Sequence, residues 1–251
     1  TIDGVTYTAP STDIEGNPRP NPAGTVPDMG AYENENGAGV YNGPVWYVDG
    51  TNDFPYANGA PGTPYFTITR GISSASDGET VSVAAGTYVE NINFNGKNIA
   101  VIGEDRKTTI IDGDSSGTVV TFINGEDSTA VLSGFTIQNG SINGSGGGIH
   151  FNNSSSPTIT NITISNNSAT DGGGIDCHWN SSPTITDVTI TNNSASSGGG
   201  ISCWYNSSPT LTNVTISGNM ASDNGGGMFI SVMSNPTLTG VTFSSNTADN
   251  D

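Results

Sequence analysis

The chain has 251 residues, of which 23 are Asp or Glu and only five are Lys or Arg, so its formal net charge is −18. Such an acidic chain repels nucleic acids and anionic membrane surfaces, which argues against nucleic-acid binding. The hydrophobic fraction is 32%, and 35 residues are glycine. These values predict a thin and regular core rather than that of a conventional globule. No run of 18 apolar residues is present, which argues against a membrane-spanning helix.

We divide the chain into an N-terminal segment, 1–40, and a repeat domain, 41–251. Within that domain we expect a cap at 41–80, irregular coils at 81–145 and regular repeats at 146–251. The cap contains YFTITRGISSASDGET, in which Phe66, Ile68 and Ile72 have the spacing of a short helix that covers the first coil. The irregular region has short β-rich runs separated by Gly and Asn turns.

The regular region repeats with a period of about 26 residues. Triple glycines begin at Gly146, Gly172, Gly198 and Gly225, at spacings of 26, 26 and 27 residues. Apolar and polar residues alternate within each unit, as in β-strands. The step from Ile185 to Val188 changes the parity of this alternation, which predicts a corner near Asp187. Equivalent corners are expected at Asn161, Asn213 and Gly240.

A unit of this length cannot bury its own apolar face, so the units must stack and pair their strands in parallel. The sequence therefore predicts an all-β fold, a parallel β-helix, in which equivalent residues form columns about 4.8 Å apart. One inward apolar column is expected at Ile159, Ile185, Leu211 and Leu238. A column of stacked amides that satisfy backbone groups at a turn is expected at Asn167, Asn193, Asn219 and Asn246.

Three segments resemble the opening of right-handed parallel β-helix repeat proteins that bacteria export. They are WYVDGTNDFPYANG, FTITRGISSASDGETVSVAAGTYVENINF and GKNIAVIGEDRKTTIIDG. The GGGI and FTIQN elements resemble the repeats of polymorphic outer-membrane proteins, and the resemblance covers roughly residues 45–251. It implies a right-handed coil and export. It leaves the activity open, because this scaffold carries lyases, esterases, adhesins and structural proteins.

Both ends of the chain suggest contacts with other copies or domains. Residues 1–40 resemble the element that closes such β-helices at their C-terminal end, although here they precede the helix. The last coil ends where the next triple glycine would begin. Because the chain begins with Thr1 rather than Met, we expect an exported protein located outside the cell or at its surface. We expect head-to-tail assembly into a filament or array, since open contacts of this kind do not close on themselves.

The repeats lack a convincing catalytic constellation. No Lys or Arg follows Lys107, and residues 141–251 contain no Glu, which disfavours lyase and glycosidase chemistry. His150, Asp176 and Ser202 occupy equivalent positions that we expect to face solvent. Asp176 would separate the other two by about 9.6 Å, too far for a triad. We therefore predict that the protein is not an enzyme.

Two acidic loops are candidate calcium sites, with no other cofactor required. Asp112, Asp114 and Ser116 match the start of a DxDxSG loop, and Asp49, Thr51 and Asp53 form a second loop. Ordinary acidic turns are the alternative interpretation of both loops.

Aromatic residues suggest a binding site. His178 and Trp179 align with Trp204 and Tyr205 of the next coil, which predicts an exposed patch that binds glycans or another protein chain. Local packing of the turn is the alternative. Cys177 and Cys203 align in an apolar column, so we expect buried free thiols. We predict a structural or adhesive surface protein, with a carbohydrate-binding or carbohydrate-processing β-helix as the alternative.

Overall fold

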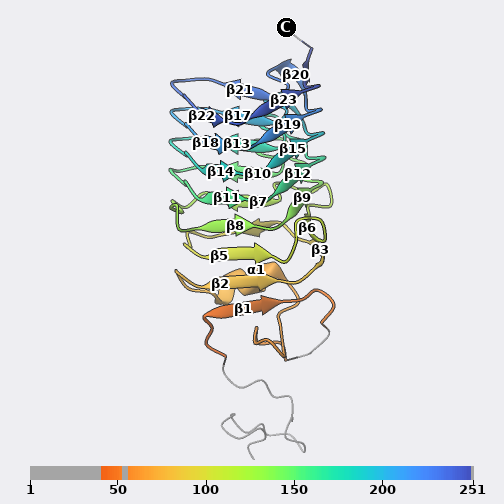
Figure 1. The fold of residues 1–251 in the computed structure, drawn as a ribbon, viewed down its shortest axis with the longest axis vertical. Helices are drawn as coiled ribbons and strands as arrows, with labels where there is room; N and C mark the ends of the chain where they lie inside the picture. The colour runs from red at the N-terminus through yellow and green to blue at the C-terminus, as the bar shows by residue number, and fades with distance from the viewer. Residues whose placement is uncertain (1–40, 53–55, 250–251) are drawn as a thin grey trace, which may run out of the picture.

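The computed structural model describes residues 41–52 and 56–249, and in these ranges the chain winds into a parallel β-helix whose coils stack in one column (Figure 1). The first wall is an eight-stranded sheet. It consists of β1 (Val45–Val48), β2 (Thr80–Val83), β5 (Ala100–Gly103), β8 (Val131–Ser133), β11 (Thr158–Thr160), β14 (Thr184–Thr186), β18 (Thr210–Thr212) and β22 (Thr237–Thr239). The N-terminal segment 1–40 and Asp53 lie outside the described residues.

Two further walls complete each coil. The second wall contains β3 (Gly86–Val89), β6 (Thr109–Asp112), β9 (Thr136–Gln138), β12 (Thr163–Ser165), β15 (Thr189–Thr191), β19 (Thr215–Ser217) and β23 (Thr242–Ser244). The third wall contains β4 (Ile92–Asn93), β7 (Val120–Phe122), β10 (Ile149–Phe151), β13 (Ile175–Cys177), β17 (Ile201–Cys203) and β21 (Met228–Ile230). A smaller sheet of β16 (Ser194–Ser197), β20 (Met220–Asn224) and β24 (Thr247–Ala248) lines one corner.

The predicted corners and columns are confirmed. Asn161, Asp187 and Asn213 all adopt positive φ, between 53° and 56°, where the chain passes from the first wall to the second. Asn and Asp tolerate this conformation better than other residues with a Cβ. Ile159 pairs with Ile185, which pairs with Leu211, and all three are buried. Leu238 continues the column, but it is 44% exposed because no described coil lies over the last one.

The central residue of each triple glycine lets neighbouring coils approach closely. A Cβ on Gly173 would lie 2.3 Å from the carbonyl oxygen of Ser194 and 2.6 Å from that of Gly199. Both oxygens belong to the backbone and have little freedom to move aside. Any side chain at this column would therefore push successive coils apart.

The predicted amide column is a buried ladder of hydrogen bonds. Asn193 Oδ1 accepts hydrogen bonds of 3.0 Å from both the backbone nitrogen and Nδ2 of Asn167. Asn193 itself donates in the same way to Asn219, and Asn193 Nδ2 also donates to the carbonyl of Ile164. Each buried amide thus satisfies groups of two coils, which fixes the register of the stack.

The predicted cap helix is α1 (Ile68–Ser74), which packs against β1, β2 and β4. Both of its ends are held by the adjacent coil. Glu90 accepts hydrogen bonds from the backbone nitrogens of Ile68 and Thr69, and Lys97 Nζ donates to three carbonyls at the C-terminal end. The negative charge of Glu90 at the N-terminal end and the positive charge of Lys97 at the C-terminal end both interact favourably with the helix dipole. Phe66 was placed on the apolar face by its spacing, which was wrong: it precedes the N-cap residue Thr67 and is 58% exposed.

Candidate functional site

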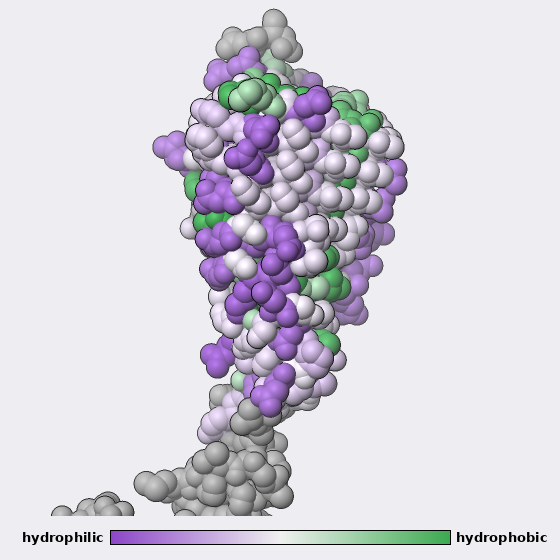
Figure 2. All heavy atoms as spheres, turned by 90° about the vertical axis from the view of Figure 1, so that its left-hand side faces the viewer, coloured by the Kyte–Doolittle hydropathy of each residue, from purple (hydrophilic) through white to green (hydrophobic). Residues whose placement is uncertain are grey.

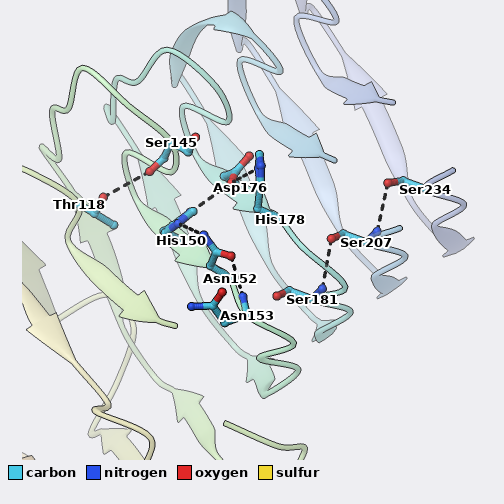
Figure 3. Close-up of polar contacts among 10 residues, drawn as sticks. All are labelled: Thr118, Ser145, His150, Asn152, Asn153, Asp176, His178, Ser181, Ser207 and Ser234. Atoms are coloured by element: carbon cyan, nitrogen blue, oxygen red, sulfur yellow. Dashed lines mark hydrogen bonds and ion pairs between the residues drawn. The ribbon is translucent and has the colours of Figure 1, made fainter. Parts of the chain in front are cut away.

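Both histidines of the chain face one buried carboxylate on the outside of the third wall (Figure 3). Strand pairing aligns His150 of β10, Asp176 of β13 and Ser202 of β17 in one column. We had expected this column to face solvent, which was wrong: the side chains of Asp176 and Ser202 are fully buried. Turns on both sides of the strands pack against this column. His178, from the turn after β13, contacts Asp176, and on the other side a Cβ on Gly172 would lie 2.9 Å from Asp176 Cα and one on Gly198 2.8 Å from Ser202 Cβ.

The distances show how closely the three groups meet. His150 Nδ1 lies 3.1 Å from Asp176 Oδ2, and His178 Nδ1 lies 3.5 Å from the same oxygen. Both are ion-pair distances, although neither contact is aligned as a hydrogen bond. The side chains of the two histidines are 17% and 19% exposed, so the rings form the outer boundary of the cluster.

A chain of amides orients His150. The backbone nitrogen of Asn153 donates to Asn152 Oδ1 at 2.7 Å, which turns Asn152 Nδ2 toward the imidazole. This nitrogen lies 3.3 Å from His150 Nε2. Because an amide NH2 only donates, Nε2 accepts, and Nδ1 carries the hydrogen that faces Asp176. His150 is thereby oriented from both sides (Figure 3).

The cluster has hydrogen-bonding groups that no described residue satisfies. Both carboxylate oxygens of Asp176, Ser202 Oγ and Trp204 Nε1 are buried without an aligned partner. Buried polar atoms in this state are costly, and in natural proteins they concentrate where a function requires them. The alignment of the repeats identified this column but did not predict that Asp176 and Ser202 are buried. The only sequence signal for the cluster was that both histidines of the chain lie near Asp176 in the aligned repeats.

The four predicted aromatic and histidine side chains form one ridge beside the cluster. We call His178, Trp179, Trp204 and Tyr205 the aromatic ridge. The rings of Trp179 and Tyr205 stack with centroids 4.3 Å apart and planes 5° apart. The ring of His178 lies 5.8 Å from that of Trp179 and 5.1 Å from that of Tyr205.

Only one side chain of the ridge is exposed. Trp179 is 50% exposed, whereas His178, Trp204 and Tyr205 are half-buried. Trp204 packs against Phe229 of β21, with ring centroids 5.1 Å apart. The prediction of four exposed rings was therefore too broad. Trp179 has Tyr205 on one face, and its other face points along the stack toward the position of Asn153, a smaller side chain.

Asp171 adds a second acidic group near the cluster. Its pKa is raised, first because burial penalises the charged form and second because Asp176 lies nearby, while His178 opposes this shift. A carboxyl with a raised pKa in the folded state costs stability when it is ionised. This cost is absent at acidic pH below the unfolded pKa, and it is fully present once the pH has risen above the folded value.

We expect Asp171→Asn to raise the melting temperature at pH 7 but not at about pH 3, where the native carboxyl is already protonated. The side chain is partly solvated, so the gain should not exceed about 1 kcal/mol. Thermal unfolding followed by circular dichroism at both pH values measures it. Asp187→Asn is the matched control, because the equivalent positions of neighbouring coils, Asn161 and Asn213, already carry Asn. An equal gain at both pH values would contradict the explanation.

In each of the two predicted calcium loops, the first carboxylate has protein hydrogen-bond partners. Asp112 accepts hydrogen bonds from the backbone of Asp114 and from the side-chain amides of Gln138 and Asn139. The pKa of Asp112 is lowered: burial, the largest influence, raises it, but these hydrogen bonds together outweigh burial. Asp49 Oδ1 accepts from Thr51. In the described ranges, no three His, Cys, Asp or Glu side chains are grouped to hold a metal ion. Calcium binding stays a prediction.

Two other predicted features have clear positions. Cys177 and Cys203 pair in register as free, buried thiols. Burial, followed by the contact with Cys203, raises the pKa of the Cys177 thiol well above its usual value, so this thiol is a poor nucleophile. Ser202 lies two coils from His150, with Asp176 between them, as expected. The absence of catalysis stays a prediction.

A family described as right handed beta helix region matches residues 71–248, which is most of the chain. The chain belongs to this right-handed β-helix family. The match and the all-parallel sheets together confirm the predicted fold class. No curated protein and no solved structure matches the chain. None of the helices in the described part has both the length and the apolar character required to cross a membrane.

Proposed function

We propose that this right-handed β-helix protein is an extracellular adhesive protein that binds carbohydrate through the aromatic ridge. The observation that carries the proposal is the stacked pair of Trp179 and Tyr205, in which Trp179 is half exposed and one of its faces has no ring against it. Flat apolar rings with polar groups close by are typical of sites that bind amphipathic ligands such as sugars.

The turn that carries Trp179 has a repeated backbone conformation. Trp179 has a positive φ of 46°, and the equivalent residues Tyr205 and Val232 of the following coils also have positive φ, so the repeated turn sets this conformation. The face of the molecule shown in Figure 2 is mainly hydrophilic or neutral, with small and scattered hydrophobic areas.

Trp179→Ala is expected to weaken the binding of an uncharged oligosaccharide by about 30-fold, the effect of removing an exposed anchor worth about 2 kcal/mol. Titration calorimetry with cellohexaose and chitohexaose measures it. Trp179→Phe should keep most of the affinity, because it retains a flat ring. Met233→Ala is the control. Met233 is an exposed apolar residue that lies two coils beyond Trp179 and outside the aromatic ridge. Equal affinity in Trp179→Ala and the native protein would refute the proposal.

End-to-end assembly, which the sequence also suggested, stays a prediction. The inward side chains Leu238 and Phe243 of the last described coil are exposed.

A further inference from the structure

The charges around the aromatic ridge restrict the ligand that it can take. Asp171 and Asp176 both interact with His178 of the ridge, and no Lys or Arg follows Lys107 in the sequence. Lys97 is bound to the carbonyls of α1, Arg106 to the carbonyl of Asp187, and Arg70 lies over the ring of Tyr65. No hydrogen bond, ion pair or cation–π contact joins these three residues, or Lys107 beside Arg106, to the ridge, so among the described residues a ligand carboxylate on Trp179 would meet no fixed cation.

His178 is the polar group best placed to contact such a ligand. Its Nδ1 faces Asp176 and is buried, which leaves Nε2 on the opposite side of the ring. In the described part of the chain, no hydrogen bond engages this Nε2. In His150, by contrast, Nε2 is already engaged by Asn152. Asp176 therefore faces one ring nitrogen of His178 at 3.5 Å and leaves the other available for a ligand.

Trp179 and His178 are consecutive residues of one coil, and their side chains lie side by side. The ring of His178 lies at the edge of the stacked pair, with its centroid 5.1 Å from that of Tyr205 and 5.8 Å from that of Trp179. A sugar ring stacked on Trp179 would present its equatorial hydroxyls sideways. These hydroxyls both donate and accept hydrogen bonds, so an imidazole nitrogen can bind them in either tautomer.

We propose that His178, beside the buried Asp176, is the polar contact that recognises an uncharged sugar stacked on Trp179, and that the site rejects polyuronates. This inference rests on the proposed carbohydrate binding and specifies its substrate class. Asp176 is a positioning residue, because it acts on the ligand through His178. The preference for uncharged sugars follows from two carboxylates near His178 and from the lack of a Lys or Arg bound beside them in the described part of the chain.

The experiment compares cellohexaose, chitohexaose and hexagalacturonate by titration calorimetry at about 0.15 M salt, where repulsion between exposed charges is screened beyond roughly 8 Å. The variants are His178→Leu, His178→Gln, Asp176→Asn and Trp179→Ala, with Asp187→Asn as the control for loss of one charge. Circular dichroism melting of each variant identifies any that fails to fold. His178→Gln removes the ring but keeps a polar amide, so it serves as the conservative variant.

We expect His178→Leu to weaken binding of the better uncharged hexasaccharide by about 3–10-fold, the effect of one lost hydrogen bond. His178→Gln should restore most of this loss, Asp176→Asn should give an intermediate loss, and Asp187→Asn should give none. Hexagalacturonate should bind at least about 10-fold more weakly than the uncharged ligand.

The outcomes separate this inference from the function on which it rests. If neither uncharged hexasaccharide binds, or if binding does not depend on Trp179, carbohydrate binding at the ridge is refuted and this inference with it. If binding depends on Trp179 but His178→Leu binds as well as the native protein, the role of His178 alone is refuted. Equal affinity for hexagalacturonate would overturn the charge preference in the same way.

Discussion

Phe122→Ala is expected to lower the free energy of unfolding by about 3–5 kcal/mol, the range for truncating a large buried aromatic side chain. Phe122 lies between Phe94 and Phe151 inside the third wall, with ring centroids 4.1 Å and 5.4 Å away, and all three are fully buried. Removing the middle ring leaves a cavity that the coils above and below cannot close, because their spacing is set by strand hydrogen bonds.

Urea unfolding followed by far-ultraviolet circular dichroism measures this loss. Phe66→Ala is the matched control, since Phe66 is largely exposed and its truncation should change stability by no more than about 0.5 kcal/mol. Stacked repeats can open locally, so hydrogen exchange should show the greatest loss of protection in the coils around residues 92–151. Similar losses in the two variants would contradict the assignment of Phe122 to the core.

Asn193→Ala is the second substitution with a large expected effect, a loss of about 3–4 kcal/mol from several buried groups left without partners. The substitution removes the acceptor for the backbone nitrogen and the Nδ2 of Asn167. It also removes the donor to Asn219 Oδ1 and to the carbonyl of Ile164. Water cannot replace these bonds without entering the stack.

The same urea and hydrogen-exchange measurements test this substitution. Asn235→Ala is the matched control, because Asn235 has an exposed side chain and a backbone without positive φ. If Asn193→Ala were no more destabilising than Asn235→Ala, the amide ladder would not hold the coils in register. A urea unfolding transition that keeps its midpoint concentration but becomes broader would instead indicate loss of coupling between neighbouring coils.

Much of the fold could be predicted from the sequence, because a stacked repeat converts sequence period directly into spatial position. The spacing of the triple glycines placed Ile159, Ile185 and Leu211 in one column, and the change of parity at Asp187 placed the corner. The helix position was predicted from Ile68 and Ile72, but Phe66 was misplaced because spacing alone does not locate an N-cap.

The candidate site was predictable only in part. Alternation correctly put Asp176 on the outer side of its strand, and alignment correctly brought Trp179 next to Tyr205. Burial of Asp176 was not predictable, because residues of the adjoining turns, among them His178 and Gly172, lie against it, and strand periodicity does not describe the paths of these turns. At the predicted calcium loop, the hydrogen bonds that Gln138 and Asn139 of the next coil donate to Asp112 were likewise not predictable from local sequence, and calcium binding there stays a prediction.

The sequence by itself therefore determined the parallel coil, its period, its corners and its inward columns, since each follows from local alternation and in-register stacking. Only the tertiary structure decided that Asp176 is buried beside the chain's two histidines and that Trp179 alone is exposed on the aromatic ridge. The physical reason is that strand geometry sets the side of the wall on which a residue lies, whereas side chains from the turns decide whether that side is open to water.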